Sequence, residues 1–200
     1  MKTVTSVRVV GLTGGIATGK SVVSNMFRKL GAFIVDADKI ARELTLPGSP
    51  IIGELVSRLG ADIRSGDGGI DRKRLRKRII EDESARLLLN RILHPAIIER
   101  EDALVKDASA PLVIVDAALL IETGSHKRFK DVILVYAPKP IQLQRLMQRD
   151  HMTEADARRF IATQMDIEEK KKIVNHLIDN SGSFSETEKQ VRRLYALFST

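Results

Sequence analysis

The sequence predicts an α/β fold in which a three-layer core with a parallel sheet carries a helical substrate-binding insertion and a helical lid. Two patterns lead to this fold class. The chain opens with a strand, a glycine-rich turn, a helix and a second strand, an order typical of parallel strand pairing. A long helical stretch without strands follows, before the apolar runs of a sheet resume near residue 112.

Strands are expected where short runs rich in Val, Ile and Leu end at turn residues. These runs cover residues 7–12, 32–35, 112–115, 132–135 and 176–179. Helices are expected where apolar residues recur at helical spacing. They cover residues 20–30, a segment from about 39, 50–60, 71–106, 140–149, and segments that begin at 153 and 185.

Local signals place several helix boundaries. Gly31 ends the first helix. Ser49 is expected to cap the helix that has Pro50 at its first position. A Ser or Thr followed three residues later by an acid marks two further helix starts, at Thr153 and Ser185. In the 71–106 stretch, the expected apolar positions are Leu75, Ile79, Leu87, Ile92 and Leu93.

These elements divide the chain into three functional parts. Residues 1–45, 109–140 and 170–200 are expected to form a nucleotide-binding core. Residues 46–108 are expected to form the helical insertion, because they hold helices without strands between two parts of the sheet. Residues 141–169 carry several arginines and are expected to form the lid.

The composition describes a globular chain of 200 residues without cysteine, 43% hydrophobic and 30% charged. The lack of cysteine excludes disulfides and thiolate metal sites, and no apolar run is long enough for a signal peptide or a membrane span. We therefore expect a cytoplasmic protein with no membrane partner. The net charge of +7 favours anionic ligands. Because tryptophan is absent and other aromatic residues are few, small phosphorylated ligands suit this charge better than nucleic acid.

A phosphate-binding motif occupies the first turn between strand and helix. Every required position of G-x-x-x-x-G-K-[ST] is matched by Gly14-Gly15-Ile16-Ala17-Thr18-Gly19-Lys20-Ser21. Glycines let backbone N–H groups curl around a β-phosphate, and the next helix adds its N-terminal N–H groups. We expect Lys20 to place a solvated positive charge near the β- and γ-phosphates of ATP, and the Ser21 hydroxyl to bind Mg²⁺. The core is therefore predicted to be of the P-loop NTPase type.

P-loops occur in kinases, in GTPase switches and in nucleic-acid motors. The chain has no Asn-Lys-x-Asp guanine motif, the nearest string being Asn175–Asp179, and it is short for a helicase. A small-molecule kinase is therefore the leading class. A nucleotide-dependent switch or nucleic-acid-binding ATPase, and a kinase with a nucleoside acceptor, are the alternatives.

Three acids follow strands, at the edge where parallel sheets bind ligands. Asp36 and Asp38 come directly after the second strand, and Asp116 ends the 112–115 strand. A kinase needs a carboxylate that accepts the proton of the attacking hydroxyl, and we assign this role to Asp38. Asp36 is the alternative base, and helix capping is the other role for this pair. Asp116 has the pattern of a Walker-B acid that holds Mg²⁺ through water, or it simply begins a loop.

Two groups of basic residues invite a functional interpretation. Arg145 and Arg149 share a helix face, and Arg158 and Arg159 follow after a turn, as expected of a lid that neutralises the transferring phosphate. Single arginines of this kind are often only solvated partners of acids. The basic run at residues 72–78 is interpreted as a solvated helix face, with contact to a polyanionic acceptor or to nucleic acid as alternatives.

Several strings taken together resemble one family, the dephospho-coenzyme A kinases. In chain order they are residues 11–16, 36–42, 93–95, 119–124, 142–149 and 178–182. The resemblance implies ATP-dependent phosphorylation of the ribose 3′-hydroxyl of dephospho-coenzyme A, the last step of coenzyme A synthesis. It implies ATP and dephospho-coenzyme A as partners, Mg²⁺ as cofactor, and the 46–108 insertion as the part that binds coenzyme A. We expect a monomer, with a weak oligomer as the alternative.

The same resemblance assigns residues to each substrate. The acceptor site would contain Thr13, Asp36, Asp38, Arg42 and His94. The donor site would include Val22, directly after the P-loop, and the Asn180 loop would contact the adenine of ATP.

The chain departs from the family pattern at three places. Ala17 replaces the usual third glycine of the loop, which requires a negative φ or some tolerated strain. Ala117-Ala118 replaces a pair that contains proline, and Asn175-His176 stands where Ala-Asp is typical.

Overall fold

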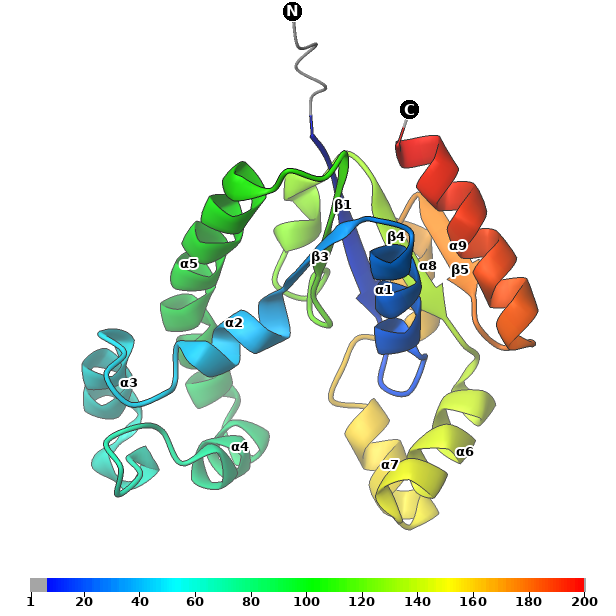
Figure 1. Cartoon of the computed structure of the whole chain (residues 1–200). Helices are drawn as coiled ribbons and strands as arrows, with labels where there is room; N and C mark the ends of the chain where they lie inside the picture. Colours follow the sequence, from blue (N-terminus) through cyan, green and yellow to red (C-terminus); the bar gives the residue numbers. More distant parts are fainter. Residues whose placement is uncertain (1–6, 200) are drawn as a thin grey trace, which may run out of the picture. The chain divides into compact units, whose positions relative to one another are not determined.

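The computed structural model describes residues 7–199, so residues 1–6 and 200 of the expected core lie outside the described part. Its centre is a five-stranded parallel sheet in the order β2-β3-β1-β4-β5 (Figure 1). The strands are β1 (Arg8–Gly14), β2 (Phe33–Asp36), β3 (Leu112–Asp116), β4 (Val132–Tyr136) and β5 (His176–Asp179). The predicted fold class and all five predicted strands are confirmed.

Helices connect the strands and build the rest of the chain. They are α1 (Lys20–Lys29), α2 (Ala37–Glu43), α3 (Ile51–Leu59), α4 (Arg72–Glu81), α5 (Glu83–Asp107), α6 (Lys139–Asp150), α7 (Glu154–Ile161), α8 (Ile167–Ile173) and α9 (Phe184–Phe198). Two short 3-10 turns are η1 (Ala61–Ile63) and η2 (Ser125–Arg128). No helix within residues 7–199 is both long and apolar enough to cross a membrane.

The chain divides into two compact units, each described by itself. The first comprises the described residues up to Asp36 and from Asp107 onward, and it contains the whole sheet. On one face of the sheet, α1 and α9 bury Phe27, Val191 and Phe198 against strand residues. On the other face Gly11 lets the chain after β3 lie close, since a Cβ there would lie 2.8 Å from the Leu120 side chain.

The second unit, Ala37–Lys106, has its own apolar core. Leu55 from α3, Ile63 from η1 and Leu89 from α5 are among its buried members. Asp71 caps α4 by accepting hydrogen bonds from the backbone N–H groups of the second and third helical residues, at 3.0 Å each.

Three local predictions are wrong. Ser49 does not cap α3: the residue before the helix is Pro50, and the buried Ser49 hydroxyl has no hydrogen-bond partner within the described chain. Leu87 is 56% exposed, because it lies on the face of α5 opposite Ala85 and Leu89. The last helix begins two residues early, because Ser183 also has an acid three residues on and forms the capping box.

Candidate active site

The P-loop joins the central strand β1 to α1 (Figure 1). Gly19 immediately precedes α1 and has a left-handed backbone, with φ 87°. The buried Thr18 hydroxyl donates a hydrogen bond to the carbonyl of Gly15 at 2.9 Å, which closes the turn. This turn and the N-terminus of α1 together offer backbone N–H groups that can bind a phosphate.

Ala17 of the P-loop has a backbone conformation that glycine would adopt without strain. Its φ is 59°, in the left-handed region that alanine enters at a cost of about 1–2 kcal/mol. The sequence left two possibilities, a negative φ or tolerated strain, and the structure has the strained form. Strain of this kind persists only where the surrounding contacts hold the backbone in place.

Lys20 and Asp116 form an ion pair beside the P-loop. Their side chains are only 14% and 7% exposed, so the expectation of a solvated lysine is wrong for this structure. Burial raises the pKa of Asp116, whereas the contacts with Lys20 and Ser24 oppose the shift. The carboxylate of Asp36 raises this pKa further, because Asp36 and Asp116 are register partners on β2 and β3.

The donor atoms at this edge of the sheet fit a magnesium ion that keeps most of its water. Ser21 offers a hydroxyl from the first turn of α1, and Asp116 offers a carboxylate from the end of β3. No cluster of three or more His, Cys, Asp or Glu suited to a metal occurs in residues 7–199. Mg²⁺ typically takes one or two protein oxygens together with waters and substrate phosphates, which matches this sparse donor set.

Asn180, directly after β5, ties four segments of the first unit together. Its backbone N–H donates to the Tyr136 carbonyl at 2.8 Å, and its carboxamide donates to the Thr18 carbonyl at 2.7 Å. Its carboxamide oxygen accepts from the Thr187 hydroxyl at 2.9 Å, and its backbone carbonyl accepts from Arg145 at 2.8 Å. The structure thus places Asn180 against the P-loop, while its contact with the adenine of ATP stays a prediction.

The two arginines of α6 have different surroundings. Arg145 is half-buried and donates to the Asn180 carbonyl, beside the P-loop. The Arg149 side chain is 60% exposed and binds the carboxylate of Asp150 through two hydrogen bonds of 2.7 and 2.8 Å. These contacts with Asp150 raise the pKa of Arg149. Only Arg145 therefore contacts a residue that holds the P-loop.

The expected helical hairpin is present. Helix α6 ends at Asp150, the next residue His151 has a left-handed φ of 52°, and α7 begins after Thr153. The Thr153 hydroxyl accepts a hydrogen bond from the backbone of Asp156, as the sequence predicted. Arg158 and Arg159 pair with acids on their own helix and have exposed side chains.

Sequence analysis missed a buried lysine that links α8 to the chain after β3. Lys170 is fully buried, donates to the Ala118 carbonyl at 3.0 Å and pairs with Glu122 at 2.8 Å. The same carbonyl accepts from the buried Thr13 hydroxyl at 3.2 Å, and Glu122 accepts from the backbone of Met165 at 3.1 Å. Glu122 lies in one of the strings that resemble the family, but nothing in the lysine run at residues 170–172 shows which of the three lysines is buried.

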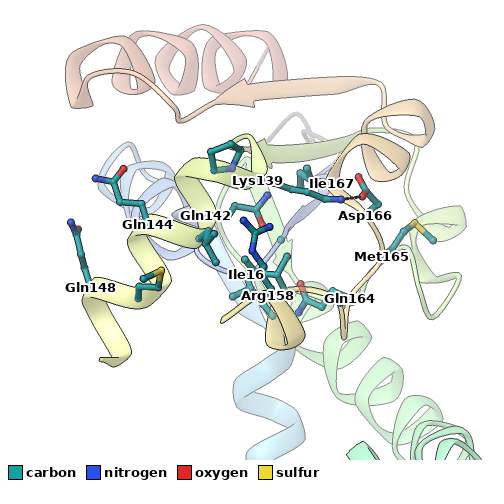
Figure 2. Close-up of a pocket in the computed structure, with 16 residues that line it drawn as sticks. Ile16, Lys139, Gln142, Gln144, Gln148, Arg158, Gln164, Met165, Asp166 and Ile167 are labelled. Atoms are coloured by element: carbon teal, nitrogen blue, oxygen red, sulfur yellow. Dashed lines mark ion pairs between the residues drawn. The ribbon is translucent and has the colours of Figure 1, made fainter. Parts of the chain in front are cut away.

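A cavity of about 750 Å³ lies within the first unit, between the P-loop, α6, α7 and the start of α8 (Figure 2). Gly15 and Ile16 line it from the P-loop. An ion pair between Lys139 and Asp166 lies along one wall (Figure 2). The volume is in the range of sites for small molecules. Val22, the remaining donor-site residue, is 44% exposed on α1.

The other predicted acceptor residues belong to the second unit. Asp38 and Arg42 lie four residues apart on α2 and therefore share a face of that helix. His94 is partly buried on α5, directly before Pro95. The roles of these three side chains toward the acceptor stay predictions.

The basic run at residues 72–78 forms most of α4 and is partly used inside the second unit. Arg72 donates to the carbonyl of Arg42 at 3.1 Å. Arg74 and Arg78 donate to backbone carbonyls of η1 and α3, at 2.9 Å each. The run was interpreted as a solvated helix face, and these contacts show that three of its arginines also bind backbone carbonyls of their own unit.

The departure at Asn175-His176 lies at the amino end of β5, at the edge of the sheet opposite the P-loop. The Asn175 side chain accepts from the backbone of Val132 at 2.7 Å. His176 contacts Asp131 at 2.9 Å, and Arg8 pairs with the same carboxylate at 2.7 Å. This departure therefore alters how strand ends are joined and not the nucleotide-binding edge.

Known proteins resemble this chain over nearly its whole length. A family model described as dephospho-CoA kinase matches residues 8–186. Dephospho-CoA kinase of Syntrophotalea carbinolica is 45% identical, covering 94% of this chain and 90% of its own, and that of Aquifex aeolicus is 41% identical, covering 93% and 95%. The solved structure of dephospho-CoA kinase from Campylobacter jejuni is 28% identical, covers 96% of both chains and gives a TM-score of 0.68.

Proposed function

This chain belongs to the dephospho-CoA kinase family, and from this premise we propose how its residues transfer the γ-phosphoryl group of ATP to dephospho-CoA. The family's reaction is a phosphotransfer to the ribose 3′-hydroxyl, which gives coenzyme A and ADP in the last step of coenzyme A biosynthesis. The observation that carries the proposal is the P-loop at the end of the central strand, with Lys20 held against Asp116.

The donor site is the P-loop with the segments that contact it. Backbone N–H groups of residues 14–21 bind the β-phosphate, and Lys20 moves from Asp116 toward the phosphates when ATP arrives. The Asn180 loop borders the adenine of ATP. Ser21 and Asp116 hold Mg²⁺, which when bound neutralises charge on the phosphates.

The transfer itself needs a base and a stabilised leaving group. Asp38 accepts the proton of the ribose 3′-hydroxyl while the 3′-oxygen of the ribose forms a bond to the γ-phosphorus. The bond from that phosphorus to the bridging oxygen breaks, and ADP leaves. Arg145 donates to the transferring phosphoryl group, and its guanidinium is already held beside the P-loop through Asn180.

The acceptor extends over residues of the second unit. Arg42 shares a helix face with Asp38 and supplies a cation for the acceptor's diphosphate, and His94 donates to the acceptor from α5. The Ala37–Lys106 unit thereby acts as the part that binds coenzyme A. We place the enzyme in the cytoplasm, since both substrates are small soluble metabolites, and we propose that it acts as a monomer.

An ADP-release assay with ATP and Mg²⁺ over a panel of hydroxyl acceptors tests this function. Turnover is expected with dephospho-CoA, and mass spectrometry should find one added phosphate on the ribose. The panel includes nucleosides and shikimate, which are hydroxyl acceptors of other P-loop kinases, as alternatives to dephospho-CoA. Turnover of one of these in preference to dephospho-CoA would overturn the proposed acceptor, and ATPase activity stimulated by DNA or RNA would favour the nucleic-acid alternative.

A further inference from the structure

The cavity beside the P-loop contains a polar atom that the protein leaves without a hydrogen bond. The carboxamide oxygen of Gln164, between α7 and α8, is buried, and no donor in residues 7–199 reaches it. Figure 2 shows Gln164 next to Arg158 at one end of the cavity. A buried acceptor without a partner lowers stability, so its presence in a cavity points to a ligand that donates to it.

Apolar side chains make up much of the cavity wall. They include Leu143, Met147, Ile161, Met165 and Ile167. Polar side chains also line the cavity, among them Gln142, Arg158 and Gln164. A mainly apolar wall that carries some polar groups suits a flat, weakly polar ring better than a sugar. The ligand group expected here is therefore a ring that carries an N–H donor.

Helix α6 separates this cavity from the side of the P-loop that Asn180 holds. Leu143 and Met147 are four residues apart and share the cavity face. Arg145 lies two residues from each, about 200° around the helix, and contacts Asn180. If the adenine of ATP lies at the Asn180 loop, the cavity face of α6 is left for a different substrate group.

We propose that this cavity binds the adenine ring of dephospho-CoA, with the Gln164 oxygen accepting a hydrogen bond from the 6-amino group. The inference rests on the proposed function, which gives the acceptor an adenine of its own. The adenine and the reacting 3′-hydroxyl are carried by the same ribose, so the ring must lie near the transferred phosphate. Gly15 and Ile16 of the P-loop line the cavity and meet this requirement. The pantetheine arm leaves the ribose through a diphosphate on the 5′ side and can extend much farther.

The first test compares two acceptors with the unmodified enzyme. In the hypoxanthine analogue of dephospho-CoA, a carbonyl replaces the 6-amino group and would face the Gln164 oxygen with a second acceptor. We expect KM for the analogue to be roughly tenfold higher than KM for dephospho-CoA, with KM for ATP unchanged. Equal KM values for the two acceptors would overturn the proposal.

The second test removes the hydrogen-bond acceptor, the carboxamide oxygen of Gln164. Gln164→Met keeps the length of the side chain without its polar atoms, so KM for dephospho-CoA should rise roughly tenfold and the preference over the analogue should disappear. Thr163→Val is the matched control, because the adjacent exposed hydroxyl donates to the Phe160 carbonyl at 2.7 Å and Thr163 does not line the cavity. Its KM for both acceptors should equal that of the unmodified enzyme.

Thermal unfolding separates this role from a structural one. Because Gln164→Met removes a buried acceptor without a partner, its Tm should equal or exceed that of the unmodified enzyme. If Gln164→Met raised KM for ATP, the cavity would belong to the phosphate donor. If it raised KM equally for dephospho-CoA and its hypoxanthine analogue, the cavity would belong to the pantetheine arm. Either result overturns the proposal. Failure of the unmodified enzyme to phosphorylate dephospho-CoA would instead reject the proposed function.

Discussion

The carboxamide nitrogen of Asn180 donates a hydrogen bond to the backbone carbonyl of Thr18 at 2.7 Å, across 162 residues of sequence. The same nitrogen fills the space that a side chain at position 19 would need, since a Cβ on Gly19 would lie 2.1 Å from it. Glycine is therefore required here for its φ of 87° and for the close approach of Asn180. The shape of the P-loop depends on a residue near the other end of the chain.

Asn180→Ala is expected to weaken ATP binding, with KM for ATP rising roughly tenfold, because the P-loop loses the bond that holds Thr18. The free energy of unfolding should fall by about 1–3 kcal/mol, since the Thr18 carbonyl loses its donor and the buried Thr187 hydroxyl keeps only the longer bond to the Ser183 carbonyl, at 3.2 Å. Steady-state kinetics and denaturant unfolding measure the two effects.

Gln190→Ala is the matched control for Asn180. Gln190 makes two hydrogen bonds, of 2.9 and 2.8 Å, with the backbone of Asp179, the residue before Asn180, and a third of 3.3 Å with the Glu186 carbonyl; none of the three involves the P-loop. Its loss should lower stability and leave KM for ATP unchanged. A similar rise in KM for both variants would show that general loosening after β5, and not the bond to Thr18, weakens ATP binding.

Gly19→Ala should abolish turnover and destabilise the protein by more than a simple backbone penalty. Gly124→Ala calibrates that penalty, because Gly124 also has a positive φ, 76°, but open space around its Cα. The cost of Gly124→Ala should be about 1–2 kcal/mol. The Gly19→Ala/Asn180→Gly double variant should recover part of the lost stability, since it removes the clashing carboxamide. Equal stabilities of the two single variants would contradict the close-approach argument.

Lys20→Met should reduce turnover by roughly a hundredfold or more, because it removes the positive charge that we propose moves to the phosphates of ATP. It should also destabilise the protein by about 3 kcal/mol, since the buried Asp116 carboxylate loses its cation. The Lys20→Met/Asp116→Asn double variant should regain most of the stability and none of the activity. Full stability of the single variant would mean that Asp116 finds another partner.

The stability of Lys20→Met should also depend on pH in a defined direction. Burial already raises the pKa of Asp116, and removal of Lys20 takes away one of the contacts that oppose this shift. A carboxyl whose pKa is higher in the folded than in the unfolded state binds its proton first in the folded state. The stability lost by Lys20→Met relative to the unmodified enzyme should therefore become smaller as pH falls from neutral through the raised pKa of Asp116. Unfolding curves of both proteins from pH 7 down to about pH 4 measure this difference, and a difference that grows as pH falls would contradict the argument.

The sheet and the P-loop could be predicted from sequence because each depends on local information. Buried parallel strands are short apolar runs, and the motif of residues 14–21 fixes residue types at fixed spacing. Capping was predicted less well: Ser183 and Ser185 both satisfy the same four-residue pattern, and only the backbone of the folded chain decides between them.

The contacts around the site were harder to predict because they join distant segments. Asn180 was expected to border ATP, but its bond to Thr18 and its conflict with a side chain at position 19 depend on tertiary structure. Lys170 resembles its exposed neighbours in sequence and is nonetheless fully buried. The cavity around Gln164 needs three helices and the P-loop to be placed together, which no periodicity describes.

Asp38→Asn should lower kcat by roughly 10²–10⁴ with little change in KM for ATP, because an amide cannot accept the proton of the 3′-hydroxyl. Asp36→Asn is the comparison, since Asp36 is the register partner of Asp116 on the neighbouring strand. A large loss in kcat for Asp36→Asn together with almost none for Asp38→Asn would assign the base to Asp36 instead.

The two lid arginines should respond differently to replacement. Arg145→Ala should lower kcat and kcat/KM together, by an amount approaching the roughly 10³-fold effect of arginine fingers, because the contact proposed for it with the phosphoryl group strengthens in the transition state. Arg149→Ala should change kcat little, since the Arg149 guanidinium is exposed and already bound to Asp150.

Arg145→Lys distinguishes this catalytic role from a structural one. Lysine keeps the charge but loses the planar fork that can bind two phosphate oxygens, so it should restore kcat only in part. If Arg145 served only to hold Asn180, its alanine variant would behave like Asn180→Ala, with a raised KM for ATP and a nearly unchanged kcat. If α6 and α7 act as the proposed lid and close over the substrates, proteolysis of residues 145–165 should also slow when ATP and acceptor analogues bind together. Unchanged proteolysis with a fully active Arg145→Ala variant would leave α6 and α7 as an ordinary solvated hairpin.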